Sequence, residues 1–320
     1  MPSERQLRQL LLAFGLAVVA WASTVSCSTA GWRLLSSSDH SHALGVCGVS
    51  FSDSRNGWLV TPAQLQRTYN GGHSWIDIRS KEDETYFDLT WLDRRTGWVV
   101  GAQNNDGTQS ALILRTIDAG NSWQEQHIEG TQRLTSITFS GRNQGWAAGV
   151  GVIANTTDAG ETWVVQYAGS ENILWSIENL DSQRAFAVGE NGTILFTVDG
   201  GITWNRKPTE LTSTLFRVRF FGDSGWIVGW GGVLLRTRDG GASWQRVSVG
   251  TTEALTDIYI SGKNGWLIGT EGTILRSLDG GDSWQWYKSP TSDSLIRLFF
   301  LSADQGWAVG ARATVLSYSD

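Results

Sequence analysis

Seven arginines in the second half of the chain are the residues best suited to recognise a partner. They are Arg184, Arg217, Arg219, Arg236, Arg238, Arg276 and Arg297. Arginine presents a planar, permanently charged fork that binds a carboxylate through two hydrogen bonds. We predict that these arginines form a surface patch that receives an acidic peptide or a C-terminal carboxylate. The alternative is a network of Arg–Asp pairs that ties neighbouring parts of the fold together.

The sequence offers little for catalysis or metal binding. It has no His-Glu-x-x-His motif, no cysteine cluster and no Gly-x-Ser-x-Gly motif. We therefore predict no catalytic residues, no metal and no cofactor, and hence no enzyme. The 25 Lys and Arg are outnumbered by 31 Asp and Glu, which gives a formal charge of −6. A chain with this balance is not built to coat nucleic acid.

The elements that must position the arginines repeat about every 40 residues. A first phrase, a small residue followed by an aromatic one, ends at Trp58, Trp98, Trp146, Phe186, Trp226, Trp266 and Trp307. A second phrase ends at Trp75, Trp123, Trp163, Trp204, Trp244 and Trp284. A fixed period of this length is typical of repeat architectures. It makes most of the 18 tryptophans part of the scaffold rather than ligand platforms.

One copy, residues 253–288, shows what each repeat contains. Residues 256–260 alternate like a strand, Asn264-Gly265 indicates a turn, and three further strands are expected at 266–269, 273–277 and 284–287. Four short strands in each repeat, without helical periodicity, predict an all-β fold. The fold expected is a seven-bladed β-propeller of four-stranded antiparallel blades.

The predicted strands sort the arginines into two positions. Arg217, Arg219 and Arg297 fall on innermost strands, where other copies carry small or acidic residues. Arg236 and Arg276 fall at the ends of third strands, with Arg184 and Arg238 in nearby turns or strand ends. The inner strands carry few acidic residues. Glu178 is one, and no partner for it is evident from the sequence.

The second phrase resembles the Asp-box, Ser/Thr-x-Asp-x-Gly-x-Ser/Thr-Trp, and residues 116–123 are a clean copy. A short Asp side chain can accept hydrogen bonds from backbone N–H groups of its own turn, and the glycine supplies a positive φ. We interpret these carboxylates as structural, rather than as calcium ligands or catalytic groups. The copy at residues 68–75 has Asn70 in place of the Asp.

The two ends of the repeat region complement each other. Residues 317–320 align with the start of a second phrase, so the last blade lacks its fourth strand. Residues 32–35 look like a fourth strand without the first three. We predict that they pair with residues 313–318, complete the last blade and close the ring, which removes open sheet edges. A longer step between two first phrases predicts an eight-residue insertion at about 103–109, a polar surface loop.

The first 27 residues do not belong to the repeat. Arg5 and Arg8 precede an apolar run, residues 10–22, that is too short to span a bilayer comfortably. We predict that residues 1–26 are a signal peptide, and that residues 28–320 form a single propeller domain.

The end of this segment, Thr24 to Cys27, resembles a bacterial lipoprotein box. Cys27 would then become the lipidated first residue of the mature chain, and simple signal cleavage is the alternative. A Cys27–Cys47 disulfide is possible in an exported protein, but a lipid on Cys27 excludes it. We interpret Cys47 as a buried free thiol.

The combination of seven Asp-box blades, a lipobox-like start, no catalytic motif and these arginines resembles the photosystem II assembly and stability factors of cyanobacteria and chloroplasts. The resemblance implies a non-enzymatic, chaperone-like factor on the lumenal side of the thylakoid membrane. Its partners would be the reaction-centre protein precursor and the early reaction-centre assembly complex. The resemblance also implies that the seven arginines named above correspond to an arginine patch of the family. The short prefix favours a cyanobacterial source.

Asp-boxes also occur in sialidases and other glycosidases, so an Asp-box glycosidase or a carbohydrate-binding propeller is the alternative function. Sialidase-like enzymes need an arginine triad, an Arg-Ile-Pro motif and a Tyr–Glu pair. The Arg-Ile-Pro motif is absent from this sequence, and Glu178 has no evident partner. The assembly factor is the preferred interpretation.

Overall fold

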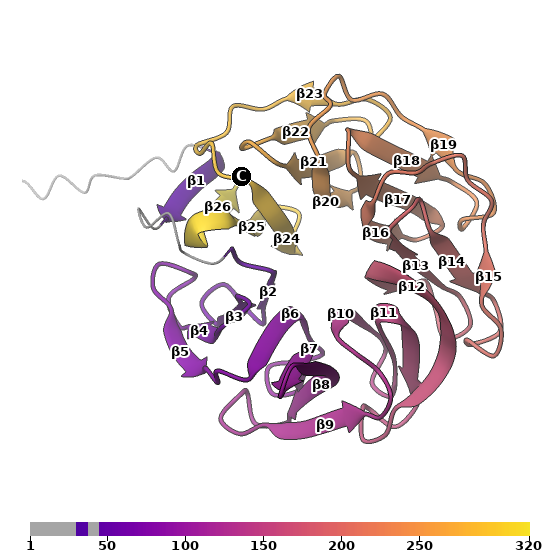
Figure 1. The fold of residues 1–320 in the computed structure, drawn as a ribbon. Coiled ribbons are helices and arrows are strands. Elements are labelled where there is room, and N and C mark those ends of the chain that lie inside the picture. The colour runs from indigo at the N-terminus through magenta and orange to yellow at the C-terminus, as the bar shows by residue number, and fades with distance from the viewer. Residues whose placement is uncertain (1–29, 38–44) are drawn as a thin grey trace, which may run out of the picture.

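The chain forms a ring of antiparallel β-sheets, seen end-on in Figure 1. This computed structural model describes residues 30–37 and 45–320, so the predicted signal peptide and Cys27 lie outside the described residues. Within these ranges the only helical turn is the 3-10 turn η1 (Ala311–Ala313). No helix of the described residues is long and apolar enough to cross a membrane.

Five sheets of the ring are four-stranded blades. The first two comprise β2 (Gly48–Phe51), β3 (Gly57–Val60), β4 (Leu65–Thr68) and β5 (Ile76–Arg79), then β6 (Glu84–Trp91), β7 (Gly97–Asn105), β8 (Thr108–Thr116) and β9 (Gln124–Ile128). The next two comprise β16 (Leu215–Phe221), β17 (Ser224–Gly229), β18 (Val233–Thr237) and β19 (Gln245–Arg246), then β20 (Leu255–Ser261), β21 (Asn264–Gly269), β22 (Ile274–Ser277) and β23 (Gln285–Trp286). The last comprises β24 (Leu295–Ser302), β25 (Gln305–Gly310), β26 (Val315–Ser319) and β1 (Gly31–Ser36).

The remaining strands form one six-stranded sheet, where the sequence predicts two separate blades. They are β10 (Leu134–Ser140), β11 (Gln144–Thr156), β12 (Val164–Asn179), β13 (Ala185–Gly189), β14 (Ile194–Thr197) and β15 (Asn205–Arg206). Two long strands change partner midway. β11 pairs with β10 and then with β12, and β12 pairs with β11 up to Ile173 and with β13 from Leu174. The prediction of seven four-stranded blades is therefore wrong in number for the described residues, which form five four-stranded blades and this wider sheet.

The innermost strands put alternate side chains into the core and into the central channel. In β16, Val218 is fully buried in the core, whereas Arg217 and Arg219 on either side of it line the channel. A bulge interrupts the pairing of β16 with β17 between Leu215 and Arg217. The same irregularity recurs in β6, β10, β12, β20 and β24. Six of the seven inner strands therefore carry a bulge at the same position, and β2 is the exception.

The Asp-boxes close the hairpins between third and fourth strands through their own hydrogen bonds. In one copy Asp118 Oδ1 accepts from the Thr116 hydroxyl at 2.8 Å and from the Ser122 N–H at 2.9 Å. The Ser122 hydroxyl donates to Asp118 Oδ2 at 2.6 Å. The main contacts recur at Asp158, Asp199, Asp239 and Asp279, and Asn70 accepts the corresponding bonds in its copy. These contacts confirm the structural role predicted for the carboxylates.

In four of the six boxes the glycine packs on the first-phrase aromatic of the preceding repeat, whereas Gly201 faces Gln166 and Gly72 faces Leu35 and Val315. Gly160 has a φ of 75°, and a Cβ built there would lie 2.5 Å from Trp98 Nε1. A Cβ on Gly281 would lie 2.9 Å from Trp226 Nε1. No side chain fits at either position, because real Cβ atoms do not approach a ring this closely. The two phrases of the sequence therefore meet across the boundary between neighbouring sheets.

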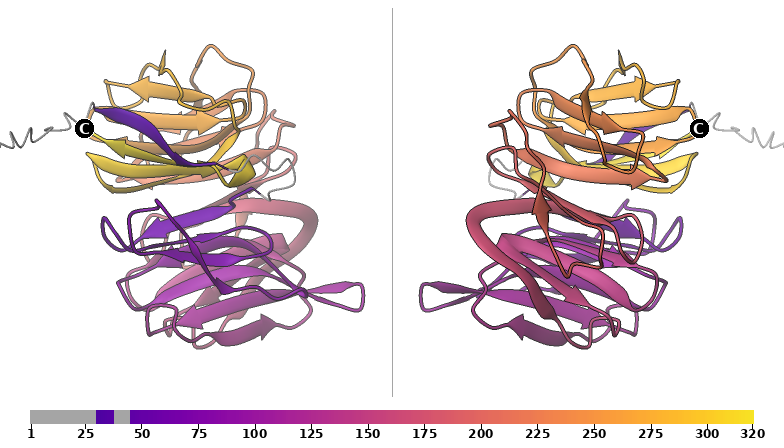
Figure 2. Two further views of the ribbon diagram at one scale, coloured as in Figure 1. Left: turned by 90° about the vertical axis from the view of Figure 1, so that its left-hand side faces the viewer. Right: turned by 90° about the vertical axis from the view of Figure 1, so that its right-hand side faces the viewer.

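β1 is hydrogen-bonded to β26, and Figure 2 shows the indigo N-terminal strand lying beside the yellow C-terminal one. The register pairs Trp32 with Tyr318 and Leu34 with Leu316, which are the residues expected from the sequence. Trp32 is 6% exposed and contacts the rings of Trp266, Phe300 and Tyr318. The predicted insertion lies where expected, but it lengthens β7 and β8 around a turn at Asp106-Gly107 instead of forming a loop.

Replacing Trp32 by Ala should remove most of the packing between β1 and its neighbours. We expect a loss of about 3–5 kcal/mol in the free energy of unfolding, because a large buried ring is deleted. The melting temperature, followed by circular dichroism, should fall by roughly 10 °C. Trp286→Ala is the matched control, because Trp286 is 60% exposed on the outer strand β23. Equal melting temperatures for the two variants would contradict a stabilising role of β1.

The Asp-boxes should make stability depend on pH in the acid range. Hydrogen bonds from Ser122 and Thr116 lower the pKa of Asp118 from 3.8 to about 2, and Asp158, Asp199 and Asp279 are lowered to about 2 in the same way. A carboxylate with a depressed folded-state pKa stabilises the fold above its unfolded pKa, and this contribution is lost as pH falls through the folded value. Stability should therefore drop from about pH 4 to about pH 2.

The double variant Asp118→Asn, Asp158→Asn tests this dependence, since Asn70 shows that the turn accommodates an amide. Urea unfolding at pH 7, 4, 3 and 2 should give a shallower loss of stability in the variant than in the wild type. Parallel curves for the two proteins would mean that these carboxylates do not control acid stability.

Candidate binding site in the channel

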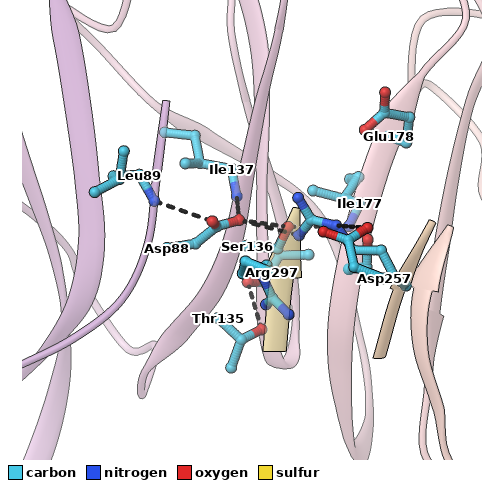
Figure 3. Close-up of polar contacts among 12 residues, drawn as sticks. Asp88, Leu89, Thr135, Ser136, Ile137, Ile177, Glu178, Asp257 and Arg297 are labelled. Carbon is cyan, nitrogen blue, oxygen red and sulfur yellow. Dashed lines mark hydrogen bonds and ion pairs between the residues drawn. The ribbon is translucent and has the colours of Figure 1, made fainter. Parts of the chain in front are cut away.

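Three arginines and three acidic residues from the innermost strands meet in the channel. Arg217, Arg219 and Arg297 share a cavity of about 240 Å³ with Asp88 and Glu178, and Asp257 contacts two of the arginines. Figure 3 shows Asp88, Ser136 and Asp257 in one row, with Glu178 apart from them and Arg297 and Thr135 on the other side of the row. The formal charges of the six ionisable groups cancel.

Asp88 and Asp257 link neighbouring sheets at equivalent positions of their strands. Asp88 accepts the N–H of Leu89 at 3.0 Å and, from the next sheet, the N–H of Ile137 at 3.3 Å. Asp257 accepts the N–H of Ile258 at 2.9 Å and that of Leu298 at 3.0 Å.

Ser136 and Ser176 occupy the same position in β10 and β12. Their hydroxyl oxygens accept the N–H of Ile177 at 3.2 Å and of Val218 at 3.3 Å. Asp or Ser therefore supplies an oxygen acceptor to the next inner strand at four of the seven equivalent positions. Repeats with Gly48, Arg217 or Arg297 cannot supply such an acceptor.

Arg217 bridges the two buried aspartates and is itself only 7% exposed. Its Nη1 lies 3.5 Å from Asp88 Oδ2, and its Nε lies 3.7 Å from Asp257 Oδ1. Burial and the neighbouring charges of Arg219 and Arg297 lower the pKa of Arg217 to about 10, which leaves it charged at neutral pH. Burial also acts to raise the pKa of Asp257, but the arginines outweigh this effect and hold it below its ordinary value.

Arg219 supplies the partner of Glu178 that the sequence did not reveal. Its Nη1 lies 3.4 Å from Glu178 Oε2, and its Nε lies 3.4 Å from Asp257 Oδ1. Burial raises the pKa of Glu178, although Arg219 and Arg217 oppose the shift. Both side chains remain in contact with solvent, with exposures of 25% for Arg219 and 20% for Glu178. This pair is the accessible part of the channel cluster.

Arg297 differs from the other two arginines of the channel. Its Nη1 donates to the carbonyl of its own neighbour Ile296 at 3.2 Å, and its buried Nε, like that of Arg217, has no hydrogen-bond partner among the described residues. Among the described carboxylates none lies within ion-pair distance of its guanidinium. Arg297 therefore keeps donor capacity for an anion from outside the chain.

The other four predicted arginines lie away from the channel. Arg236 donates to the Gly280 carbonyl of the next sheet at 3.2 Å, and both Arg236 and Arg238 pair with Asp282. Arg184 Nε lies 2.7 Å from Asp181 and its Nη1 lies 3.5 Å from Asp223 in the adjoining sheet.

Arg276 lies over the Trp266 ring, as Arg236 lies over Trp226. Arg67 and Arg115, at the same strand position, also donate to carbonyl groups of the following sheet. The seven arginines thus form a channel group and a peripheral group instead of one continuous patch. Most of them have partners within the chain.

An aromatic pocket beside Arg297 escaped the sequence analysis. It has a volume of about 330 Å³ and is lined by Phe87, Trp175, Phe216 and Trp230, with Arg297 at its edge. The available signal was that Trp175 and Trp230 belong to neither repeated phrase. Cys47 also lines the pocket and is a free, half-buried cysteine. Burial raises its thiol pKa to about 11, so it stays protonated.

The arrangement is better suited to binding than to acid–base chemistry. Asp88 and Asp257 use their oxygens for backbone N–H groups and arginines, and Glu178 is paired with Arg219. In the described ranges no group of three His, Cys, Asp or Glu side chains is placed to hold a metal ion.

The fold and its boxes define an Asp-box β-propeller. The sequence model of the family described as "Photosynthesis system II assembly factor YCF48" matches residues 74–170, 164–254 and 251–319. These matches span more than half of the chain, and the chain belongs to this family. No curated protein matches it at a significant level.

Solved structures share the fold at low sequence identity. "YCF48 bound to D1 peptide" matches with a TM-score of 0.73 and 22% identity over 90% of this chain and 97% of that chain. "YCF48 from Cyanidioschyzon merolae" matches with a TM-score of 0.72 and 18% identity over 91% and 99%. A GH74 xyloglucanase from Xanthomonas campestris has a TM-score of 0.69 and 12% identity over 90% of this chain and 53% of its own length.

Removing the charge of Arg217 should destabilise the fold. Arg217→Met leaves Asp88 and Asp257 buried without their shared cation, and breaking a buried pair in this way costs about 3–5 kcal/mol. Urea unfolding at pH 7 measures the effect. Arg238→Met is the control, because its 66% exposed side chain makes a surface ion pair worth at most about 1 kcal/mol. If the two variants lose the same stability, Arg217 does not hold the channel together.

Proposed function

We propose that this protein is a non-enzymatic assembly factor of photosystem II that binds the newly made reaction-centre protein. Membership of the assembly-factor family is the observation that carries the proposal. A structure of similar fold is described as bound to a D1 peptide, which supports the reaction-centre protein as the partner. The early reaction-centre assembly complex is the larger assembly in which this contact would be made.

The arginines serve this function in two ways. Arg219, Arg297, Arg184 and Arg238 are accessible and contact acidic or carboxyl-terminal groups of the partner. Arg217, Arg236 and Arg276 are held by partners or rings of the chain itself and keep the binding surfaces rigid. A rigid, preformed surface binds an extended segment without ordering many of its own side chains.

We further propose that the protein acts on the lumenal side of the thylakoid membrane of a cyanobacterium. The charged start and apolar run of residues 1–26 support export, and a lipid on Cys27 would keep the mature chain near the membrane. A single lipid chain gives only reversible membrane binding, so the contact with the partner would add to the anchoring.

The ring is proposed to act as a closed seven-bladed unit. Two observations support this. The strands β11 and β12 each change pairing partner along their length, so the wide sheet contains the strands of two repeats. The strand β1 also pairs with β26. In addition, Trp307 donates its indole N–H to the Gly71 carbonyl at 2.9 Å, which joins the last repeat to the first.

The binding test uses a fluorescent peptide with the sequence of the C-terminal tail of the reaction-centre precursor. The double variant Arg219→Gln, Arg297→Gln removes two accessible channel charges and should weaken binding about tenfold or more, as expected for lost charge-assisted hydrogen bonds. Fluorescence anisotropy at two salt concentrations measures affinity and its electrostatic part.

Arg246→Gln, Lys288→Gln is the matched control, since it removes two positive charges from exposed peripheral residues. Binding of this control should stay within about twofold of the wild type, because exposed charges far from the contact are screened. Equal weakening by both double variants would reject a localised site and indicate only net-charge attraction. Turnover of xyloglucan or sialyl substrates by the wild type would instead favour the glycosidase alternative.

A further inference from the structure

The aromatic pocket opens at the end of the propeller where the inner strands begin. Phe87, Trp175, Phe216 and Ile296 stand directly before the channel residues of their strands, and Trp230 follows β17. Because third strands run parallel to first strands, the Asp-box turns lie at the opposite end of the ring. The pocket is therefore separate from the peripheral arginines. Its volume of about 330 Å³ suits one or two side chains rather than a folded element.

An exposed tryptophan stands at the rim of this pocket. Trp230 is 61% exposed, and its ring lies edge-on to Phe216 at a centroid distance of 6.5 Å. The repeat does not require an aromatic here, since equivalent positions hold Thr270 and Glu190. Exposed tryptophan beside an apolar pocket is typical of the energetic centre of a protein–protein contact.

The hydroxyl groups that line the pocket are already used by the fold. Thr135 donates to the Leu174 carbonyl, Thr256 donates to the Leu295 carbonyl at 2.7 Å, and Thr270 donates to Glu253 at 2.6 Å. Their methyl groups therefore define the wall. A sugar or another ligand with several hydroxyls would lose most of its water contacts here, because only Trp175 and Arg297 offer buried donors without a partner among the described residues, and this loss is unfavourable.

Arg297 is the exception, because it lines both this pocket and the polar cavity of the channel. Its guanidinium has no described carboxylate within ion-pair distance, and its Nε has no hydrogen-bond partner. A buried donor without a partner is unfavourable, so an entering anion would relieve this site. The pocket thus combines an apolar wall with one available cation.

We infer that this pocket binds the free C-terminus of a peptide that ends in an apolar residue, with the side chain against Trp175 and Trp230 and the terminal carboxylate on Arg297. The inference rests on the proposed function and narrows it to one end of the partner chain. A C-terminus fits better than an internal acidic residue. An internal segment would bring two flanking peptide groups into a wall whose threonine hydroxyls already donate within the fold and in which the Trp175 indole N–H is the one buried donor besides Arg297 without a partner among the described residues.

Short peptides test the inference by isothermal titration. The probe is acetyl-Gly-Ala-Leu-Phe with a free carboxylate, and it is compared with its C-terminal amide and with acetyl-Gly-Ala-Leu-Ser. The amide should bind about tenfold or more weakly because the charge-assisted bonds to Arg297 are lost. The Ser peptide should also bind about tenfold more weakly because the apolar side chain is lost. Equal binding of the free acid and the amide would overturn the inference.

Three variants assign the contacts. Arg297→Gln should abolish the preference for the free acid over the amide, whereas Arg219→Gln, which is not in the pocket wall, should retain it. Trp230→Ala should weaken the acid and the amide by the same factor, and its exposed position leaves the fold intact. A preference for the acid that survives in Arg297→Gln, or unchanged affinity in Trp230→Ala, would contradict the inference. Octanoate that binds while the peptides do not would also overturn it.

The two proposals fail in different ways. If the wild type captures the reaction-centre protein and both Trp230→Ala and Arg297→Gln capture it equally well, the pocket is not the contact and the proposed function stands. If the wild type does not capture that protein, the proposed function fails. The peptide titration still decides whether the pocket recognises an apolar C-terminus.

Discussion

The contact between an aromatic ring of one repeat and the Asp-box glycine of the next holds the ring in shape. It appears between Trp58 and Gly120, Trp98 and Gly160, Phe186 and Gly241, and Trp226 and Gly281. At the last boundary before closure the box is missing. There Trp32 and Tyr318 pack on Trp266 instead, at centroid distances of 5.6 and 5.0 Å. Each contact joins two neighbouring sheets. Together the contacts set the spacing of the inner strands around the channel.

This geometry dictates the charges of the channel. Neighbouring inner strands approach closely enough that the N–H groups of one strand need oxygen acceptors from the strand before it, which Asp88, Ser136, Ser176 and Asp257 provide. Two buried carboxylates would repel each other, so Arg217 lies between them. The cluster is thus a consequence of packing the inner strands side by side, and Arg297 is the channel arginine without a described carboxylate at ion-pair distance.

The features that recur in the repeats could be predicted from the sequence. Strands, turns, Asp-boxes and the pairing of residues 32–35 with the last strand all follow from a pattern that recurs. The wide sheet could not be predicted, because continuity of β12 past Ala168 depends on the local backbone and not on the spacing of tryptophans. The arginine patch was predicted as one surface, but Arg236 and Arg217 have intramolecular partners that only three-dimensional neighbours reveal. Trp175 and Trp230 belong to neither repeated phrase, and the sequence analysis assigned them no role.

The same argument explains why binding should concentrate where the repeat is broken. A residue that recurs in every copy is needed to hold neighbouring sheets together, and its replacement costs stability before it affects a partner. Phe216, Trp230 and Arg297 do not recur in this way. Phe216 and Trp230 line the open apolar wall of the pocket. Arg297 stands at a position where other repeats supply an oxygen acceptor. The exposed ring of Trp230 and the buried Nε of Arg297, which has no hydrogen-bond partner among the described residues, are both unfavourable in the isolated chain. A ligand that covers the ring and supplies an anion removes both penalties at once.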